Sequence, residues 1–290
     1  MERFLPIDLH MHSTVSDGTD SPAELLRRVR ELGLGLFSLT DHDAVSGCRE
    51  IASLLRPGDP LFLTGVEFSC RDEEGRYHIL GYGSDPDSPD IKALVDAGHG
   101  LRIRKVRARL ARLEDEYGFS FPPDETAALF RLDNPGKPHI ARLMVKHGFS
   151  RTIGEAITNY IDRLHLVSEH IRPEAAVSAV IAAGGIPVLA HPVFGDGRQF
   201  VAGDALEARI LRLTDMGLAG VEAYYSGFAP ELCREVVSIA ERHSLLITAG
   251  SDYHGANKSV PLGNTGLRAD ESPPDGLIRF LKEAGTRLVR

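Results

Sequence analysis

Two closely spaced histidines near the start of the chain, His10 and His12, could bind a metal ion. In an extended strand, residues i and i+2 point to the same face, so both imidazoles would lie on one side. Asp17 follows five residues later and, with Gly18, forms a turn-type pair that would bring its carboxylate back toward the imidazoles. Such a group suits a divalent transition metal, although two surface histidines on an edge strand would have the same spacing.

Other apolar, strand-like runs also end in or near residues that can bind metals. These are Asp41 and His42, Glu67, His78, His191, and Asp252 and His254. In α/β folds the carboxyl ends of the strands form the active-site face. Chance placement of the 12 histidines would not direct so many ligand-type side chains to one face. Any one of them alone could be a core or surface residue, but together they indicate a metal site.

Strand-like and helix-like segments alternate along most of the chain and would position these residues. After the opening strand, strand-like runs lie at 36–40, 61–67, 77–82, 186–190, 220–224 and 245–249, and helical segments at 22–32, 44–56, 173–183, 204–216, 230–243 and 273–284. Ser21, Pro22 and Glu24 have the spacing of a helix start. The alternation predicts a parallel sheet, either an open doubly wound sheet or a closed barrel.

Between about residues 100 and 164 the pattern is almost entirely helical, which predicts a small helical insertion. Its first helix would bury one face containing Val106 and Leu113. Basic residues crowd the remaining faces from Arg102 to Arg112. A solvated helix face is the favoured interpretation of this basic run, and a channel for an RNA strand is the alternative.

Composition limits the protein class. The net charge of −8 does not favour a general nucleic-acid coat, because phosphate backbones require clustered positive charge. Cys48, Cys70 and Cys233 have no Cys-x-x-Cys spacing, so neither a disulfide framework nor a thiolate zinc site is indicated. No secretory signal is evident, and no apolar run approaches the roughly 18–20 residues of a membrane span. We therefore expect a cytoplasmic protein without membrane contact.

The motifs His-x-His, Ser-Asp-Gly, Thr-Asp-His-Asp, a strand-end glutamate, Ala-His-Pro and Ser-Asp-x-His occur in this order. Together they resemble the polymerase and histidinol phosphatase (PHP) family of metallophosphoesterases, over nearly the whole chain. The resemblance implies an α/β fold, a distorted (β/α)7 TIM-like barrel formed by residues 1–99 and 165–290. The helical insertion, residues 100–164, would cap the active site. Two or three divalent ions, manganese, iron or zinc, would lie at the carboxyl end of the barrel.

The resemblance also implies an assignment of nine ligands. His10 and His12 would hold one ion with Glu67 and Asp252, Asp17 and His42 a second with His254, and His78 and His191 a third with Glu67 again. Glu67 can bridge two ions because a carboxylate has two oxygens. Some relatives have a histidine where this chain has Asp17.

Three further aspartates, Asp8, Asp41 and Asp43, are expected to accept hydrogen bonds from ligating imidazoles. For Asp43 a helix N-cap is an equally good interpretation.

Substrate-binding residues are expected in two places. In the insertion, Lys137, His139 and Arg142 surround a helix start, which favours anions, and in relatives a helix-borne His/Arg pair faces the active site. After a strand of the barrel, Tyr225 and Ser226 could stack on a base or bind a phosphate.

A lysine that many relatives have after the insertion is not evident in residues 162–168. Arg163 and His165 are the candidates to replace it.

The resemblance therefore predicts a phosphoesterase that acts on small nucleotides, namely nucleoside 3′,5′-bisphosphates and, as a second activity, short 5′-phosphorylated RNA. A metal-activated hydroxide would be the nucleophile, with no side-chain nucleophile, and no obligatory protein partner is inferred. Histidinol-phosphate phosphatase is an alternative, but its relatives normally lack this insertion. A non-catalytic, metal-stabilised binding module is another, although such modules typically lose ligands.

Overall fold

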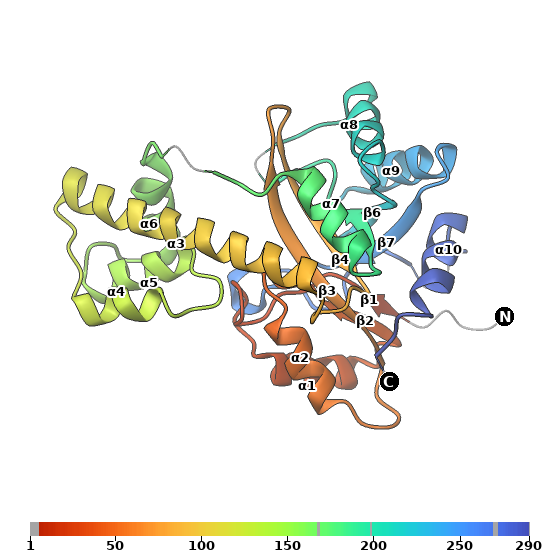
Figure 1. Ribbon diagram of the computed structural model, residues 1–290, viewed down its shortest axis with the longest axis horizontal. Helices are drawn as coiled ribbons and strands as arrows, with labels where there is room; N and C mark the ends of the chain where they lie inside the picture. Colours follow the sequence, from red (N-terminus) through yellow and green to blue (C-terminus); the bar gives the residue numbers. More distant parts are fainter. Residues whose placement is uncertain (1–5, 167–168, 198, 269–271, 290) are drawn as a thin grey trace. The chain divides into compact units, whose positions relative to one another are not determined.

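The computed structural model describes residues 6–166, 169–197, 199–268 and 272–289, which form two compact units (Figure 1). The barrel unit comprises Met1–Val95 and Ile171–Arg290, and the helical unit comprises Asp96–His170. The last two residues of the segment 162–168 lie outside the described residues.

The barrel unit is built around one sheet of seven strands in the order β1-β2-β3-β4-β5-β6-β7. The strands are β1 (Ile7–Asp8), β2 (Leu36–Leu39), β3 (Leu61–Arg71), β4 (Arg76–Tyr82), β5 (Ile186–Leu189), β6 (Gly220–Tyr225) and β7 (Leu246–Gly250). The two ends of the sheet meet, because Leu9 N–H donates to Ala249 O and Met11 forms a parallel bridge with Tyr253. The predicted barrel is thereby confirmed.

One strand departs from the predicted parallel arrangement. β4 runs antiparallel to both β3 and β5, whereas the other neighbouring strands are parallel. Only four residues connect β3 to β4, too few for the crossover that a parallel pair requires. Asp72 Oδ1 closes this turn by accepting from the N–H groups of Glu74 and Gly75. The amino end of β4 therefore lies at the carboxyl end of β3, which brings His78 opposite Ser69.

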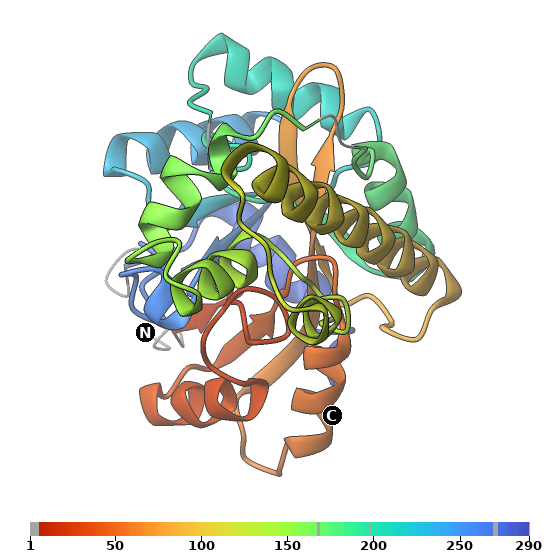
Figure 2. The ribbon, with the colours of Figure 1, turned by 90° about the vertical axis from the view of Figure 1, so that its left-hand side faces the viewer.

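Helices cover the outside of the sheet. They are α1 (Pro22–Leu32), α2 (Ser46–Leu54), α7 (Pro173–Ala182), α8 (Asp204–Thr214), α9 (Pro230–Arg242) and α10 (Asp275–Ala284). Figure 2 shows α1 and α2 on one side of the sheet and α8 and α9 on the opposite side. α1 begins as predicted, since the Ser21 side chain accepts from Glu24 N–H, and it ends at Gly33 with φ 64°.

The α1 face that contacts the sheet contains the fully buried Leu25, Leu26 and Val29. Each such side chain contributes about 1.5–3 kcal/mol on burial.

The helical unit has its own apolar core. Its elements are most of α3 (Pro89–Tyr117), followed by α4 (Pro123–Leu129), α5 (Lys137–Lys146), α6 (Ile153–Asn159) and the 3-10 helix η1 (Ile161–Arg163). Val106 and Leu113 of α3 are fully buried, against Ile140 and Met144 of α5. Among the helices within the described ranges, none combines the length and the apolar character needed to cross a membrane.

Candidate metal centre

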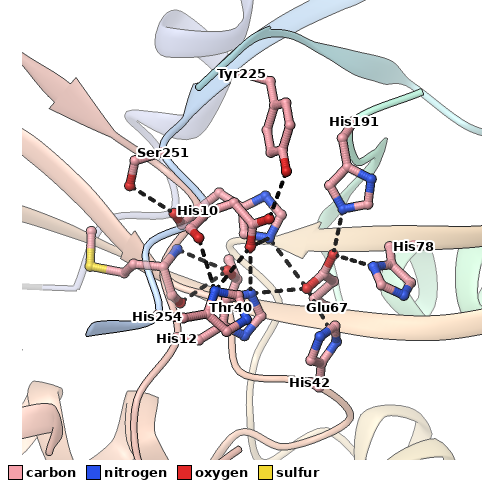
Figure 3. A network of polar contacts seen from close by, with 12 residues as sticks. His10, His12, Thr40, His42, Glu67, His78, His191, Tyr225, Ser251 and His254 are labelled. Atoms are coloured by element: carbon pink, nitrogen blue, oxygen red, sulfur yellow. Dashed lines mark hydrogen bonds and ion pairs between the residues drawn. The ribbon is translucent and has the colours of Figure 1, made fainter. Parts of the chain in front are cut away.

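The first group of potential ligands consists of residues just past the ends of β1 and β7 and of Glu67 within β3. His10 and His12 are both completely buried just past β1. Their Nε2 atoms lie 3.2 and 3.0 Å from Glu67 Oε2 (Figure 3). Asp252 Oδ1 is 3.6 Å from His10 Nε2 and 3.4 Å from His12 Nε2. The structure thus brings together the four residues expected to share one ion.

A second group combines His12, Asp17, His42 and His254, whose potential ligand atoms all lie within 4.8 Å of one another. His254 Nε2 is 3.2 Å from Asp17 Oδ1, and His42 Nε2 is 4.0 Å from Asp17 Oδ2. The sequence placed His12 only with the first ion, whereas in the structure it belongs to both groups. His12 therefore lies at the boundary between the two groups.

Glu67 connects the first group to a third. Its Oε1 lies 2.8 Å from His78 Nδ1 and 3.2 Å from His191 Nε2. Its Oε2 faces His10, His12 and, at 3.2 Å, His42 Nδ1. The side chain is 1% exposed. Each of its two oxygens faces a different set of imidazoles. This two-sided arrangement is what a carboxylate shared by two cations requires.

Several buried atoms of the cluster face one another without an assigned hydrogen bond. His10 Nε2, His12 Nε2, His78 Nδ1 and Glu67 Oε2 are buried and make no hydrogen bond within the described part of the chain. Leaving a buried polar atom unsatisfied costs about 1–3 kcal/mol. A cation among them would satisfy several at once. Imidazole nitrogens and carboxylate oxygens without thiolates fit manganese, iron or zinc.

The charges of the cluster also favour a bound cation. Burial lowers the pKa of His12, but the carboxylates of Asp252 and Glu67 outweigh it and raise that pKa to about 9. Burial likewise raises the pKa of Asp252, but His10 and Lys258 outweigh it and hold that pKa well below its usual value. The carboxylates are therefore ionised at neutral pH, and a bound cation can replace the protons that they hold on the imidazoles.

The main chain is strained at two of these residues. His191 and Asp252 have φ angles of 27° and 56°, in the left-handed region that residues other than glycine rarely adopt. Specific bonds hold both conformations. His191 N–H donates to Glu222 Oε2, and Asp252 N–H donates to His10 O. Such strain is concentrated at functional sites, where the surrounding structure maintains it.

The sequence did not indicate Glu222, which contacts two of the candidate ligands. This β6 residue is completely buried. Its Oε1 lies 2.9 Å from His10 Nδ1, and its Oε2 lies 2.9 Å from the main-chain nitrogen of His191. By accepting the Nδ1 proton, the carboxylate directs the lone pair of His10 Nε2 toward Glu67 and Asp252. The sequence signal for Glu222 was that it is an acidic residue within an otherwise apolar strand.

Asp8 has another role than the one predicted, whereas for Asp43 a bond to an imidazole stays a prediction. Asp8 accepts from the main-chain N–H and the hydroxyl of Ser251, at 2.9 and 2.6 Å, and from Gly263 N–H at 2.8 Å. It joins the ends of β1 and β7 rather than orienting an imidazole. Asp43 Oδ1 accepts from Ser69 N–H at 2.9 Å, and the N-cap of α2 is Val45, so Asp43 does not cap that helix.

Asp41 acts on a ligand indirectly. Its carboxylate accepts from Ser13 N–H at 2.8 Å, from the Ser13 hydroxyl at 2.7 Å and from the Ser16 hydroxyl at 2.5 Å. Ser16 Oγ in turn lies 3.4 Å from His12 Nδ1. The predicted imidazole contact is therefore replaced by a contact through a serine, and Asp41 fixes the loop that follows the two histidines.

A cavity of about 400 Å³ adjoins the cluster. It is lined by His42, Glu67, His78, His191, Phe194, Asp196, Gly197, Tyr225, Asp252 and Lys258. This size is within the range of small-molecule sites. Tyr225, a predicted substrate-binding residue, lines the cavity, whereas the Ser226 hydroxyl donates to Ser251 O at 2.8 Å. Lys258 was not predicted.

The predicted substrate-binding residues of the helical unit lie together on α5. Lys137 forms an ion pair with Asp162, and His139 Nδ1 accepts from Gly136 N–H at 3.2 Å. Arg142 is exposed one turn further along α5. Their part in substrate binding stays a prediction, as does the cap formed by the insertion.

An α/β barrel with a buried cluster of imidazoles and carboxylates at the end where its parallel strands finish defines a class of metal-dependent barrel enzymes. Comparison with known families narrows the class, since the PHP domain matches residues 8–160. The chain is 32% identical to the 3′,5′-nucleoside bisphosphate phosphatase of Chromobacterium violaceum, over 98% of each chain. It therefore belongs to the PHP domain family.

Two further relatives agree with this assignment. A 5′-3′ exoribonuclease of Haemophilus influenzae is 29% identical, over 88% of this chain and 92% of the relative. The crystal structure of a candidate metal-dependent phosphoesterase from Bifidobacterium adolescentis is similar with a TM-score of 0.79. That protein is 29% identical, and the match covers 96% of each chain. The family and the fold predicted from the motifs are confirmed.

Proposed function

We propose that this protein is a metal-dependent phosphoesterase that removes phosphate from small nucleotides, with nucleoside 3′,5′-bisphosphates as the leading substrate class. The observation that carries the proposal is Glu67, a buried carboxylate whose two oxygens face five imidazoles. The bisphosphate phosphatase that is 32% identical over 98% of the chain supports the substrate class. The similarity to an exoribonuclease supports short RNA as a second substrate.

Nine residues would hold two or three divalent ions. The first ion would bind His10, His12, Glu67 and Asp252, the second Asp17, His42 and His254, and the third Glu67, His78 and His191. Divalent ions about 3.5–4 Å apart lower the pKa of a bound water and neutralise a phosphoryl group during in-line displacement. Glu222 would keep the His10 ring in the orientation and tautomer that this requires.

The side chains of the cavity would orient the ester rather than attack it. Its lining within the described residues contains no serine, threonine or cysteine. Cys48 is buried elsewhere, and burial raises the pKa of its thiol to about 12, so that thiol is a poor nucleophile. The lining histidines, Glu67 and Asp252 are proposed metal ligands. Asp196 is paired with Arg76, and the Tyr225 hydroxyl donates to Asp252, so water is the proposed nucleophile. Trapping a covalent phosphoenzyme would contradict this part of the proposal.

Two alternatives are less well supported. A non-catalytic binding module typically loses ligands, whereas all nine candidate positions here carry competent residue types. A histidinol-phosphate phosphatase would have to accommodate the helical unit that its relatives normally lack. Neither description is among the relatives reported above.

A substrate panel tests the proposal. The metal-loaded protein would be incubated with a nucleoside 3′,5′-bisphosphate, the corresponding 5′-monophosphate, histidinol phosphate and a 5′-phosphorylated oligonucleotide, and released phosphate measured. The proposal expects the bisphosphate to have the highest kcat/KM. Fastest release from histidinol phosphate would favour the alternative, and release from none of them would favour the binding module. A cytoplasmic location remains a prediction.

A further inference from the structure

The two carboxylate oxygens of Asp252 face different surroundings. Oδ1 is directed to the Nε2 atoms of His10 and His12. Oδ2 accepts from the Tyr225 hydroxyl at 3.0 Å and lies 2.5 Å from Lys258 Nζ. Figure 3 shows the Tyr225 hydroxyl directed toward the cluster. Lys258 and Tyr225 therefore lie on the side of Asp252 opposite the two histidines.

The loop after β7 brings Lys258 to this position. Past His254 the chain forms the 3-10 helix η2 (Gly255–Asn257). Ala256 N–H donates to the Thr19 hydroxyl, and the Asn257 side chain donates to Asp17 O. These bonds anchor the loop to the segment that follows the first two histidines. The Lys258 side chain is 41% exposed and lines the cavity, so its ammonium group is accessible to a ligand.

A phosphate ester entering this cavity would meet mostly groups that do not attract it. Among the described lining residues, Glu67, Asp196 and Asp252 are acidic, whereas Lys258 is the one lysine or arginine. Even with cations at the histidines, the remaining phosphate oxygens need a donor that carries positive charge.

We propose that Lys258 binds the phosphate group of the substrate. This inference rests on the proposed phosphoesterase function. An ammonium group has three donors, so Lys258 can keep its contact with Asp252 while it donates to a phosphate oxygen. Tyr225 bonds the same carboxylate oxygen and limits where the lysine side chain can lie.

The competing explanation is that Lys258 only holds Asp252 in place. Two variants separate these roles: Lys258→Met removes the charge and keeps the apolar stem, and Lys258→Arg keeps the charge. Lys92→Met is the matched control, because Lys92 forms a similar ion pair with Asp87 at 2.9 Å and does not line the cavity. Binding of inorganic phosphate to the manganese-loaded proteins would be measured by calorimetry, and bound manganese by elemental analysis.

We expect Lys258→Met to weaken phosphate binding about tenfold or more, as loss of a charge-assisted hydrogen bond predicts. Its manganese content should equal that of the wild type, Lys258→Arg should recover most of the affinity, and Lys92→Met should bind phosphate normally. Unchanged phosphate affinity in Lys258→Met would overturn the inference. Loss of manganese from that variant would also overturn it, by assigning Lys258 to holding Asp252.

The assay separates this inference from the proposed function. Phosphate binding requires no turnover, so it can be measured even if the wild type hydrolyses none of the panel substrates. In that case the proposed function fails, while a Lys258-dependent phosphate affinity still supports the inference. A wild-type protein that binds no phosphate would overturn the inference itself.

Discussion

Replacing Glu222 by glutamine should weaken metal binding although Glu222 is not a proposed ligand. The substitution keeps the size of the side chain but replaces one oxygen by an NH2 group. In the wild type, Glu222 lies 2.9 Å from both His10 Nδ1 and His191 N. Both partners act as donors, and one amide has only one oxygen to offer them. The main chain of Gly250 packs closely against this carboxylate, since a Cβ there would lie 2.4 Å from Glu222 Oε1.

Either orientation of the amide has a cost. If its NH2 group faces His191, a buried N–H is left unpaired, which costs about 1–3 kcal/mol at a residue whose φ is already strained. If it faces His10, Nδ1 must become the acceptor and the proton moves to Nε2, the atom that faces Glu67 and Asp252. A protonated Nε2 cannot ligate a metal. Loss of such a supporting contact typically lowers metal affinity about 10- to 100-fold.

The assay is a manganese titration in a metal buffer, read by the rise in melting temperature as metal binds the folded protein. Glu222→Gln should need about 10- to 100-fold more free manganese than the wild type for the same stabilisation. Glu231→Gln, which changes an exposed glutamate paired with Arg234, is the control and should behave as the wild type. A wild-type titration curve for Glu222→Gln would refute the reasoning.

Three further predictions concern separate parts of the chain. Asp8→Asn should lower the melting temperature by roughly 2–10 °C in calorimetry, because it disrupts bonds between the ends of β1 and β7. An unchanged melting temperature would contradict that role. Arg142→Ala should raise KM for a bisphosphate about tenfold. Arg151 is exposed, and Arg151→Ala should leave KM unchanged. A wild-type KM in Arg142→Ala would remove Arg142 from the substrate site. At pH 8 the Cys48 thiol, with its pKa raised to about 12 by burial, should stay protonated and resist alkylation until the protein unfolds, as mass spectrometry can show.

The ligand cluster could be predicted because parallel strands bring their carboxyl ends to one edge. His10, His191 and Asp252 follow strands and needed only that rule. His78 reaches the same edge for another reason, since it lies near the amino end of the antiparallel β4. The four-residue connection between β3 and β4 is the local signal for that reversal.

The supporting contacts could not be predicted in the same way. Glu222 is separated by 212 residues from His10, and their contact depends on which way two side chains point inside a closed barrel. Asp8 was expected to accept from a ligating imidazole, yet it bonds Ser251, which is 243 residues away in the sequence. Lys258 lies in the loop after β7, which is bonded to Thr19 and Asp17, residues more than 230 positions earlier in the chain.

The central claim is that Glu67 organises a centre of at least two metal ions. Elemental analysis of the purified, manganese-loaded wild type and of Glu67→Gln tests it most directly. The account predicts two or three equivalents per chain in the wild type and at least one fewer in the variant, with phosphate release lost. One equivalent or none in the wild type, or an unchanged metal content in Glu67→Gln, would contradict it.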